Sequence, residues 1–455
     1  MATITGTNGA NVLYGTSGND ELLGLGGNDR LVASGGNDIL NGGDGTDIAD
    51  YRSLNEDITL NPRGILNKSG GGQDKLVEIE SIWGNTNRVN TIDASSANGT
   101  GAGIDVDLST DMLRVFIPSL GYRDVTIKNF SNIVGTDRSS RFVGNYRNNN
   151  ITGGSSNDYI VGSRGYDTLN GGGGFNTLDY SGLGRAVKIL PRGKIDKSGF
   201  GIDTTINFSK IIGATNQTNT IDASSDTASS ANLNVNLANN SLGIENIPVG
   251  NGVVSQQFEV VNFVNVTGSK NNDSIVGGNV ASKLVGGGGN DTVKGGTQND
   301  SITGTNRTAR GVGEVDYLSG GGGSNKFILG DSRGAYYLGN GANDFAMIND
   351  FNLFTDSLDL GRLRDYSFNV EASGIIDLFS GSDVNTRDLI AKIQLANSVP
   401  SYSRTTKSAM GGSQMLAMGA APMMSKVSGL ELDTNGIAPQ FNILSGASSI
   451  AESVV

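Results

Sequence analysis

The chain has 455 residues, with 69 Gly, 7 Pro, no Cys and no His, and its 45 acidic and 33 basic residues give a formal net charge of −12. This acidic balance argues against nucleic acid and anionic membrane as partners. The missing residue types exclude disulfides, a thiol nucleophile and the commonest general base, and without a run of about 18 apolar residues no membrane span is expected.

Four consecutive nonapeptides begin at Gly15 and read GTSGNDELL, GLGGNDRLV, ASGGNDILN and GGDGTDIAD. Each has an Asp at its sixth position, and an aliphatic residue follows two positions later in the first three, as in Leu22 after Asp20. Ala49 is the weaker fourth member of that series. Such strict spacing is not needed in a Gly/Asn-rich flexible linker, which is the simplest alternative.

The repeat has a physical logic. The six residues GGxGxD are expected to form a turn in which Gly visits positive φ and brings carbonyl groups close together. The next three residues form a short strand whose aliphatic side chain points inward. If two nonapeptides complete one coil, turns of alternate repeats lie above one another. Their carbonyl and carboxylate oxygens can then enclose calcium, which accepts about 6–8 oxygen ligands in flexible geometry.

The pattern returns in two later blocks, where Asn176 and Asn325 replace Asp in two repeats. The predicted calcium ligands of all three blocks are Asp20, Asp29, Asp38, Asp47, Asp158, Asp167, Asp273, Asp291, Asp300 and Asp316. Asp29 and Asp38 lie inside the first run of four repeats, so we expect them to contribute most to calcium affinity.

On these motifs the chain resembles the RTX, or hemolysin-type, calcium-binding nonapeptide-repeat family of the kind common in cyanobacteria. The resemblance implies an all-β fold: a parallel β-roll or β-solenoid with calcium-binding glycine-rich turns and a C-terminal β-rich cap. It also implies export by a type I system and folding on calcium outside the cell.

A longer unit of about 130 residues is duplicated. NPRGILNKSGGGQD (61–74) is matched by LPRGKIDKSGFGID (190–203), 129 residues later. We interpret the two copies as wider coils of the same solenoid, with separate β-sandwich inserts as the alternative. The expected organisation is a first repeat block at 5–50, a wider module at 51–134, a second block at 135–178, the duplicate module at 179–267, a third block at 268–328, a capping domain at 329–397 and a tail at 398–455.

The two ends of the chain carry expectations about export and assembly. The N-terminus lacks the basic patch and apolar core of a Sec signal peptide. The Met-rich tail 398–455 looks like an uncleaved type I secretion signal, with a disordered tail or an assembly segment as alternatives. The first coil has no counterpart of the C-terminal cap, so we expect self-association through its open edge.

These observations favour a secreted, extracellular structural protein that forms or decorates a surface layer, sheath or fibre. Its expected partners are calcium, further copies of the chain and a cell-surface polysaccharide. The alternative is a secreted β-solenoid lyase or epimerase acting on acidic polysaccharide. A pore-forming toxin would need a long apolar or amphipathic helical region. Residues 330–334 fit the G-x-S-x-G pattern of esterases, but that site needs a histidine, so we expect no catalytic role.

Overall fold

The computed structural model describes residues 1–226, 230–249, 252–361, 366–381, 383, 385–396, 430–432 and 441–443. The chain divides into two compact units, Met1–Gln217 and Thr218–Val455. Every regular element in the described ranges is a β-strand, apart from one 3-10 turn, η1 (Ser95–Ala97). The predicted all-β fold class is therefore confirmed.

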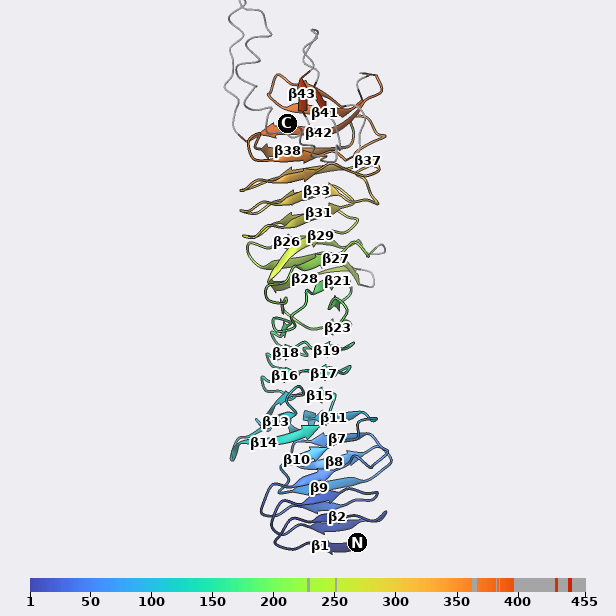
Figure 1. Cartoon of the computed structure of the whole chain (residues 1–455), viewed down its shortest axis with the longest axis vertical. Coiled ribbons are helices and arrows are strands. Elements are labelled where there is room, and N and C mark those ends of the chain that lie inside the picture. Colours follow the sequence, from blue (N-terminus) through green and yellow to red (C-terminus); the bar gives the residue numbers. More distant parts are fainter. Residues whose placement is uncertain are drawn as a thin grey trace, which may run out of the picture. The chain divides into compact units, whose positions relative to one another are not determined.

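The first repeat block forms two rows of parallel strands, because consecutive nonapeptides contribute strands to the two rows in turn (Figure 1). One row holds β1 (Ala2–Thr5), β3 (Asp20–Leu23) and β5 (Ile39–Asn41), and the other holds β2 (Val12–Tyr14), β4 (Arg30–Val32) and β6 (Ile48–Asp50). Partners are 18 residues apart, as in Leu22 opposite Leu40 and Leu13 opposite Leu31. This register confirms that two nonapeptides make one coil.

The first wider module continues both rows and adds antiparallel hairpins. Its strands are β7 (Ile58–Asn61), β8 (Ile65–Lys68), β9 (Gln73–Val77), β10 (Ser81–Trp83), β11 (Asn90–Asp93), β12 (Gly103–Asp107), β13 (Met112–Ile117), β14 (Gly121–Lys128) and β15 (Asn132–Val134). The strand β9 pairs in parallel with β5, and β10 pairs in parallel with β6. The extra length lies in two antiparallel meanders, β7–β8–β9 and β12–β13–β14.

The second block and the start of the duplicate module complete the first unit. Their strands are β16 (Arg141–Val143), β17 (Asn150–Thr152), β18 (Tyr159–Val161), β19 (Thr168–Asn170), β20 (Thr177–Asp179), β21 (Lys188–Leu190), β22 (Lys194–Asp196), β23 (Ile202–Ile206) and β24 (Lys210–Ile212). The meander β21–β22–β23 repeats the arrangement of β7–β8–β9, as the duplicated sequence predicts.

The second unit uses the same parallel pairing and closes with a meander. Its strands are β25 (Asn219–Asp222), β26 (Asn232–Asn236), β27 (Ser241–Val249), β28 (Gly252–Val261), β29 (Phe263–Thr267), β30 (Ser274–Val276), β31 (Lys283–Gly287), β32 (Thr292–Lys294), β33 (Ser301–Thr305), β34 (Val315–Ser319), β35 (Lys326–Ile328), β36 (Gly330–Asp331), β37 (Gly334–Ala335), β38 (Phe345–Phe351), β39 (Ser357–Asp359), β40 (Tyr366–Val370), β41 (Ile376–Ser380), β42 (Asp388–Leu395), β43 (Leu430–Leu432) and β44 (Phe441–Ile443). The parallel rows extend through β38 and β39, and β40–β41–β42 forms an antiparallel sheet on β38.

Apart from β43 and β44, the predicted secretion tail 398–455 lies outside the described residues.

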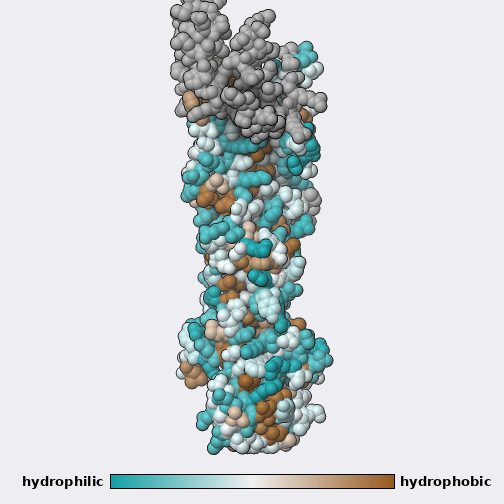
Figure 2. Space-filling view, in the orientation of Figure 1, coloured by the Kyte–Doolittle hydropathy of each residue, from teal (hydrophilic) through white to brown (hydrophobic). Residues whose placement is uncertain are grey.

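The core of each unit is a set of stacked side chains, about one per strand. In one column Leu22 and Leu40 meet in register, and both are buried. A column of the second unit holds Val235, Ile275, Val293, Leu318, Ile348 and Ile393, all buried. On the face shown in Figure 2, hydrophobic residues lie in small groups among hydrophilic ones. The short strands bury little apolar surface each, so other forces must hold the turns.

Candidate calcium sites in the stacked turns

All ten predicted aspartates are buried, although carboxylates are rarely buried without a partner. The most exposed is Asp273, at 3%, and Asp47, Asp291 and Asp316 are at 0%. Eight of them lie directly before a strand of one of the parallel rows, whereas Asp20 begins β3 and Asp316 is the second residue of β34. The structure therefore brings the predicted residues together in stacks.

One oxygen of each carboxylate joins adjacent coils. Asp38 Oδ1 accepts a hydrogen bond from the backbone N–H of Asp20 at 2.9 Å, and Asp47 Oδ1 accepts one from Asp29 at 2.6 Å. The same ladder runs through the later blocks: Asp291 Oδ1 accepts from Asp273 at 2.8 Å. Backbone N–H groups in the turns are thus paired by side chains of the next coil.

The second oxygen has no common partner. Asp29 Oδ2, Asp47 Oδ2 and Asp291 Oδ2 are buried and accept no hydrogen bond among the described residues. In Asp20 this oxygen instead accepts from the Thr16 hydroxyl at 2.8 Å, and it accepts from a backbone N–H of its own turn in Asp158, Asp273 and Asp300. A buried carboxylate oxygen without a partner costs folding free energy. The turns of Asp29, Asp47 and Asp291 therefore favour a bound cation most strongly.

A narrow space beside these oxygens is kept open by the first glycine of the turn. A Cβ added at Gly24 would clash with both Asp29 Oδ2 and the Gly42 carbonyl oxygen of the next coil. A Cβ at Gly286 would clash in the same way with Asp291 Oδ2 and the Gly304 carbonyl. Carboxylate and carbonyl oxygens are the ligands that calcium prefers, so the residues fit this ion.

The described residues contain no group of three or more His, Cys, Asp or Glu side chains placed to hold a metal. A calcium ion in these turns would therefore take a large share of its ligands from backbone carbonyl groups. Backbone ligands need room to approach the ion, and Gly provides that room because it has no side chain. This accounts for a repeat that is rich in Gly and has few acidic residues.

Burial raises the pKa of several of these carboxyl groups. The pKa of Asp291 rises to about 10, through desolvation and the nearby Asp316 carboxylate. Desolvation also raises the pKa of Asp316 to about 7 and that of Asp273 to about 6. Asp20 is the opposite case, because hydrogen bonds from the Thr16 backbone and hydroxyl lower its pKa. A divalent cation would offset the desolvation that raises these pKa values.

Sequence reasoning missed a second ladder, formed by the Asn that precedes Asp in many repeats. Asn19 Oδ1 accepts a hydrogen bond from the Asn37 backbone N–H at 2.8 Å, and Asn272 Oδ1 accepts one from Asn290 at 2.8 Å. Asn and Asp therefore join a coil to its two neighbours in opposite directions. The recurring Asn-Asp pair in the repeats was the available signal.

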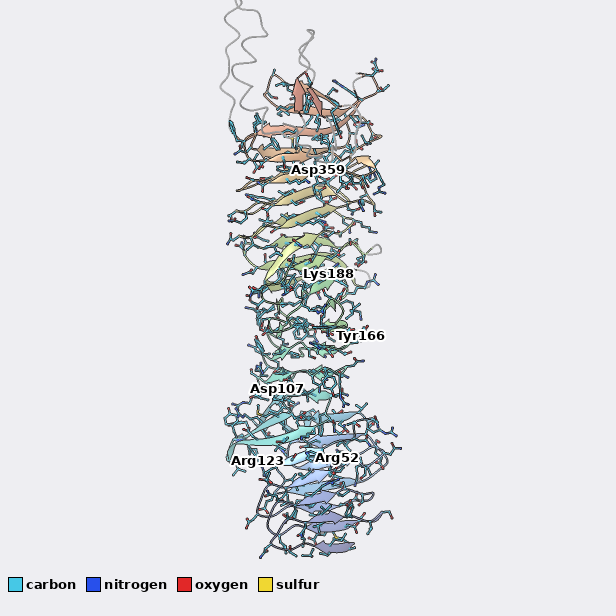
Figure 3. The ribbon with its side chains drawn as sticks, viewed as in Figure 1. Arg52, Asp107, Arg123, Tyr166, Lys188 and Asp359 are labelled. Atoms are coloured by element: carbon cyan, nitrogen blue, oxygen red, sulfur yellow. The ribbon has the colours of Figure 1, made fainter. Side chains whose placement is uncertain are left out.

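A lyase or epimerase acting on acidic polysaccharide would need a groove with basic side chains, for which Arg114, Arg123, Arg138 and Arg141 are the candidates. Three of these four side chains contact other side chains. Arg114 pairs with Asp124 at 2.7 Å, and Arg123, labelled in Figure 3, pairs with Glu80 at 3.3 Å. The guanidinium of Arg138 lies 4.0 Å from the centre of the Phe116 ring. For Arg141, the structure gives a backbone hydrogen bond to Asp105.

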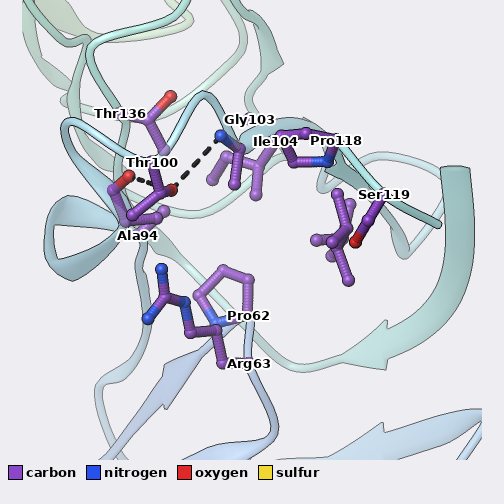
Figure 4. A pocket seen from close by; sticks show the side chains of 13 residues that line it. Pro62, Arg63, Ala94, Thr100, Gly103, Ile104, Pro118, Ser119 and Thr136 are labelled. Atoms are coloured by element: carbon purple, nitrogen blue, oxygen red, sulfur yellow. Dashed lines mark hydrogen bonds between the residues drawn. The ribbon is translucent and has the colours of Figure 1, made fainter. Parts of the chain in front are cut away.

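A pocket of about 380 Å³ lies between the β7–β8 turn and the β12–β13 hairpin (Figure 4). Its lining is mostly apolar or small, as in Pro62, Ala94, Ile104 and Pro118. Arg63 is the one titratable residue of that lining. The pocket does not supply the paired acid and base that a sugar lyase would use.

The space that Gly24 keeps open between Asp29 Oδ2 and the Gly42 carbonyl oxygen, called the glycine cradle below, gives a direct test of calcium binding. Gly24→Ala is expected to weaken calcium binding at the Asp29 turn by at least about tenfold, because the new Cβ would occupy the space between carboxylate and carbonyl. Gly18→Ala is the matched control, since its Cβ would meet only Thr16 Oγ1 at 3.8 Å. Calcium titration calorimetry compares the two variants, and equal losses would show that the cradle is not the binding site.

Comparison with known proteins gives one sequence-family match. The RTX calcium-binding nonapeptide repeat matches in four copies, at residues 3–31, 23–51, 143–178 and 267–302. No curated protein matches the chain. The crystal structure of the extracellular lipase LipA from Serratia marcescens is similar at 17% identity, with a TM-score of 0.18, over 59% of this chain and 43% of the lipase. On its repeat sequence and its parallel rows of strands, the chain carries RTX calcium-binding nonapeptide repeats in a β-roll fold.

Proposed function

We propose that the protein is a secreted structural component, a calcium-stiffened roll that forms or decorates an extracellular layer, sheath or fibre. The observation that carries this proposal is the series of buried carboxylates stacked along the repeat blocks, which includes oxygens without hydrogen-bond partners. The roll and its hairpins account for nearly all described residues. A calcium-dependent scaffold is the role that such an arrangement serves best.

Secretion by a type I system is part of the same proposal. A chain whose turns require calcium stays unfolded in a calcium-poor cytoplasm and folds outside, which suits export in the unfolded state. The described part of the chain has no helix with the length and apolar character to cross a bilayer.

We further propose that the chain is not itself an enzyme. The pocket of about 380 Å³ supplies a single titratable side chain, Arg63, and two of the candidate arginines are held in ion pairs. Incubation with acidic polysaccharides tests the alternative: release of unsaturated sugar products, or a change in sugar epimer, would favour a lyase or epimerase.

Electron microscopy of the purified protein with and without calcium tests the structural role. Calcium-dependent sheets or fibres are the expected result. A protein that remains monomeric at high concentration in calcium would contradict assembly, and a role as a single surface-bound rod or an enzyme would then gain weight.

The first coil offers the edge for assembly. In the described chain, β1 pairs only with β3, and the N–H groups of Ala2 and Gly6 donate toward that neighbour. The N–H of Thr3, one residue on from Ala2, therefore points to the open edge. An open edge of this kind can pair with another chain.

Thr3→Pro is therefore expected to abolish calcium-dependent assembly, because proline removes that donor. Calcium affinity and thermal midpoint should stay within error of the parent, and Thr3→Ala, which keeps the N–H, should still assemble. Sedimentation velocity in calcium gives the measurement. Assembly by the proline variant would rule out this edge.

A further inference from the structure

Two lysines of the duplicated module lie inside the stacks of carboxylates. The side chains of Lys68 and Lys197 are 0% exposed, although lysine is among the residues least often buried. They occupy equivalent positions in NPRGILNKSGGGQD and LPRGKIDKSGFGID. Each follows the last strand pair of a repeat block, where the roll meets an antiparallel hairpin.

The ammonium group of Lys68 donates only to oxygen atoms in the described structure. Lys68 Nζ lies 2.6 Å from Asp74 Oδ1, 3.5 Å from Asp38 Oδ2 and 2.8 Å from the Ser34 carbonyl oxygen. Tyr51 Oη donates to the other Asp74 oxygen at 2.9 Å. Two carboxylates from adjacent coils and a turn carbonyl are the donor set that calcium would use.

The second copy reproduces this set. Lys197 Nζ lies 2.9 Å from Asp167 Oδ2 and 2.7 Å from the Ser163 carbonyl, and it also pairs with Asp203. Tyr180 Oη donates to Asp203 at 2.6 Å. The buried ammonium group is therefore a feature of the module and was retained in both copies.

The third repeat block shows the same coil without a lysine. Asp291 and Asp316 stand where Asp38 and Asp74 do, and Tyr337 donates to Asp316 Oδ2 at 2.6 Å, as Tyr51 does to Asp74. The structure gives these two carboxylates no cationic partner among the described residues, and Asp291 Oδ2 accepts no hydrogen bond. Where the ammonium is missing, a carboxylate oxygen is left for an ion.

In one repeat a neutral side chain, Asn176, stands where the other repeats have the aspartate. Asn176 Oδ1 keeps the ladder bond from Asp158 at 2.8 Å. Its Nδ2 donates to the carbonyls of Gly173 at 2.9 Å and Asn207 at 3.0 Å. The amide thus donates hydrogen bonds to carbonyl oxygens of the turns, a type of oxygen that in other repeats lines the space proposed for calcium.

We propose that Lys68 and Lys197 are built-in cations, each taking the place of a calcium ion at the coil that closes its repeat block. The proposal rests on the calcium role proposed above. Each ammonium balances part of the charge of two stacked carboxylates at any calcium concentration, so these two coils close without an ion. Calcium is then needed only at the positions that lack an internal cation.

The test replaces the lysines in the full chain and counts bound calcium by equilibrium dialysis. Lys68→Ala and Lys197→Ala, made singly, remove the ammonium and leave room for an ion, so each should bind about one more calcium per chain than the parent. At a calcium concentration that only partly saturates the parent, each should also melt lower than the parent, and saturating calcium should restore its melting temperature. Lys68→Met fills the space without charge, so it should gain no ion and show no such recovery.

Lys75→Ala, at an exposed position in the same meander, is the matched control and should keep the calcium count of the parent. Alanine variants that bind no extra calcium would overturn the proposal. Failure of both alanine variants to fold in saturating calcium would overturn it too, because an ion in the vacated position should restore the coil. A parent that binds no calcium would instead defeat the calcium role itself, so the two failures are distinguishable.

Discussion

Chelation of calcium is expected to remove most of the β-structure of the protein. The buried carboxylates of the stacked turns would then face one another without a counter-charge, and several kcal/mol per uncompensated buried charge is a typical penalty. At a calcium concentration of about 100 times the dissociation constant, each site contributes about 2.7 kcal/mol. A few such sites together equal the whole stability of an ordinary domain, about 5–15 kcal/mol.

Far-ultraviolet circular dichroism in chelator and in millimolar calcium measures this change. The single tryptophan, Trp83, gives a second readout, because it lies in β10 with the Arg52 guanidinium 4.1 Å from its ring centre. Magnesium at equal ionic strength is the control, and it should restore little, since it demands a tighter octahedral site. A spectrum that chelator leaves unchanged would contradict a calcium-dependent fold.

The repeat made the coil predictable from sequence. The 18-residue spacing of Asp20 and Asp38 predicted how many residues make one coil. The aliphatic residues after them predicted its core, because a strand of three residues can point only its middle side chain inward. The structure confirms both, with Leu22 and Leu40 buried and in register. Local pattern and global fold agree within the repeat blocks.

The wider modules were less predictable, because their contacts join residues that lie far apart in the sequence at no regular spacing. Lys68 lies 30 residues from Asp38 in sequence, and nothing in the spacing shows that a hairpin returns its ammonium group to the stack. Asp38 was expected to weigh heavily in calcium binding, yet its Oδ2 lies 3.5 Å from Lys68 Nζ. The duplicated motif showed that this lysine recurs but not what it contacts.

The metal-free protein should show an unusual dependence of stability on pH. Desolvation raises the pKa of Asp167 and Asp273 to about 6 and that of Asp316 to about 7, above the ordinary value of 3.8. A carboxyl group with a raised pKa in the folded state contributes stability that is fully present below pH 3.8 and is lost as pH rises through the folded value. Each pKa unit corresponds to about 1.4 kcal/mol, so these groups together can cost several kcal/mol between pH 4 and pH 8.

Calcium should reverse that dependence, because the ion binds the ionised carboxylates and displaces their protons. We therefore expect the chelated protein to keep more of its folded structure at pH 5 than at pH 8, and the calcium-loaded protein to melt at a higher temperature at pH 8 than at pH 5. Carboxyl groups with lowered pKa values, such as Asp331, affect stability only below about pH 4 and leave this window unchanged. Differential scanning calorimetry at the two pH values, with and without calcium, measures both trends. Chelated protein whose stability does not fall from pH 5 to pH 8 would show that these carboxyl groups are not held in the dry stacks that the structure describes, since solvated groups would titrate alike in the folded and unfolded chains.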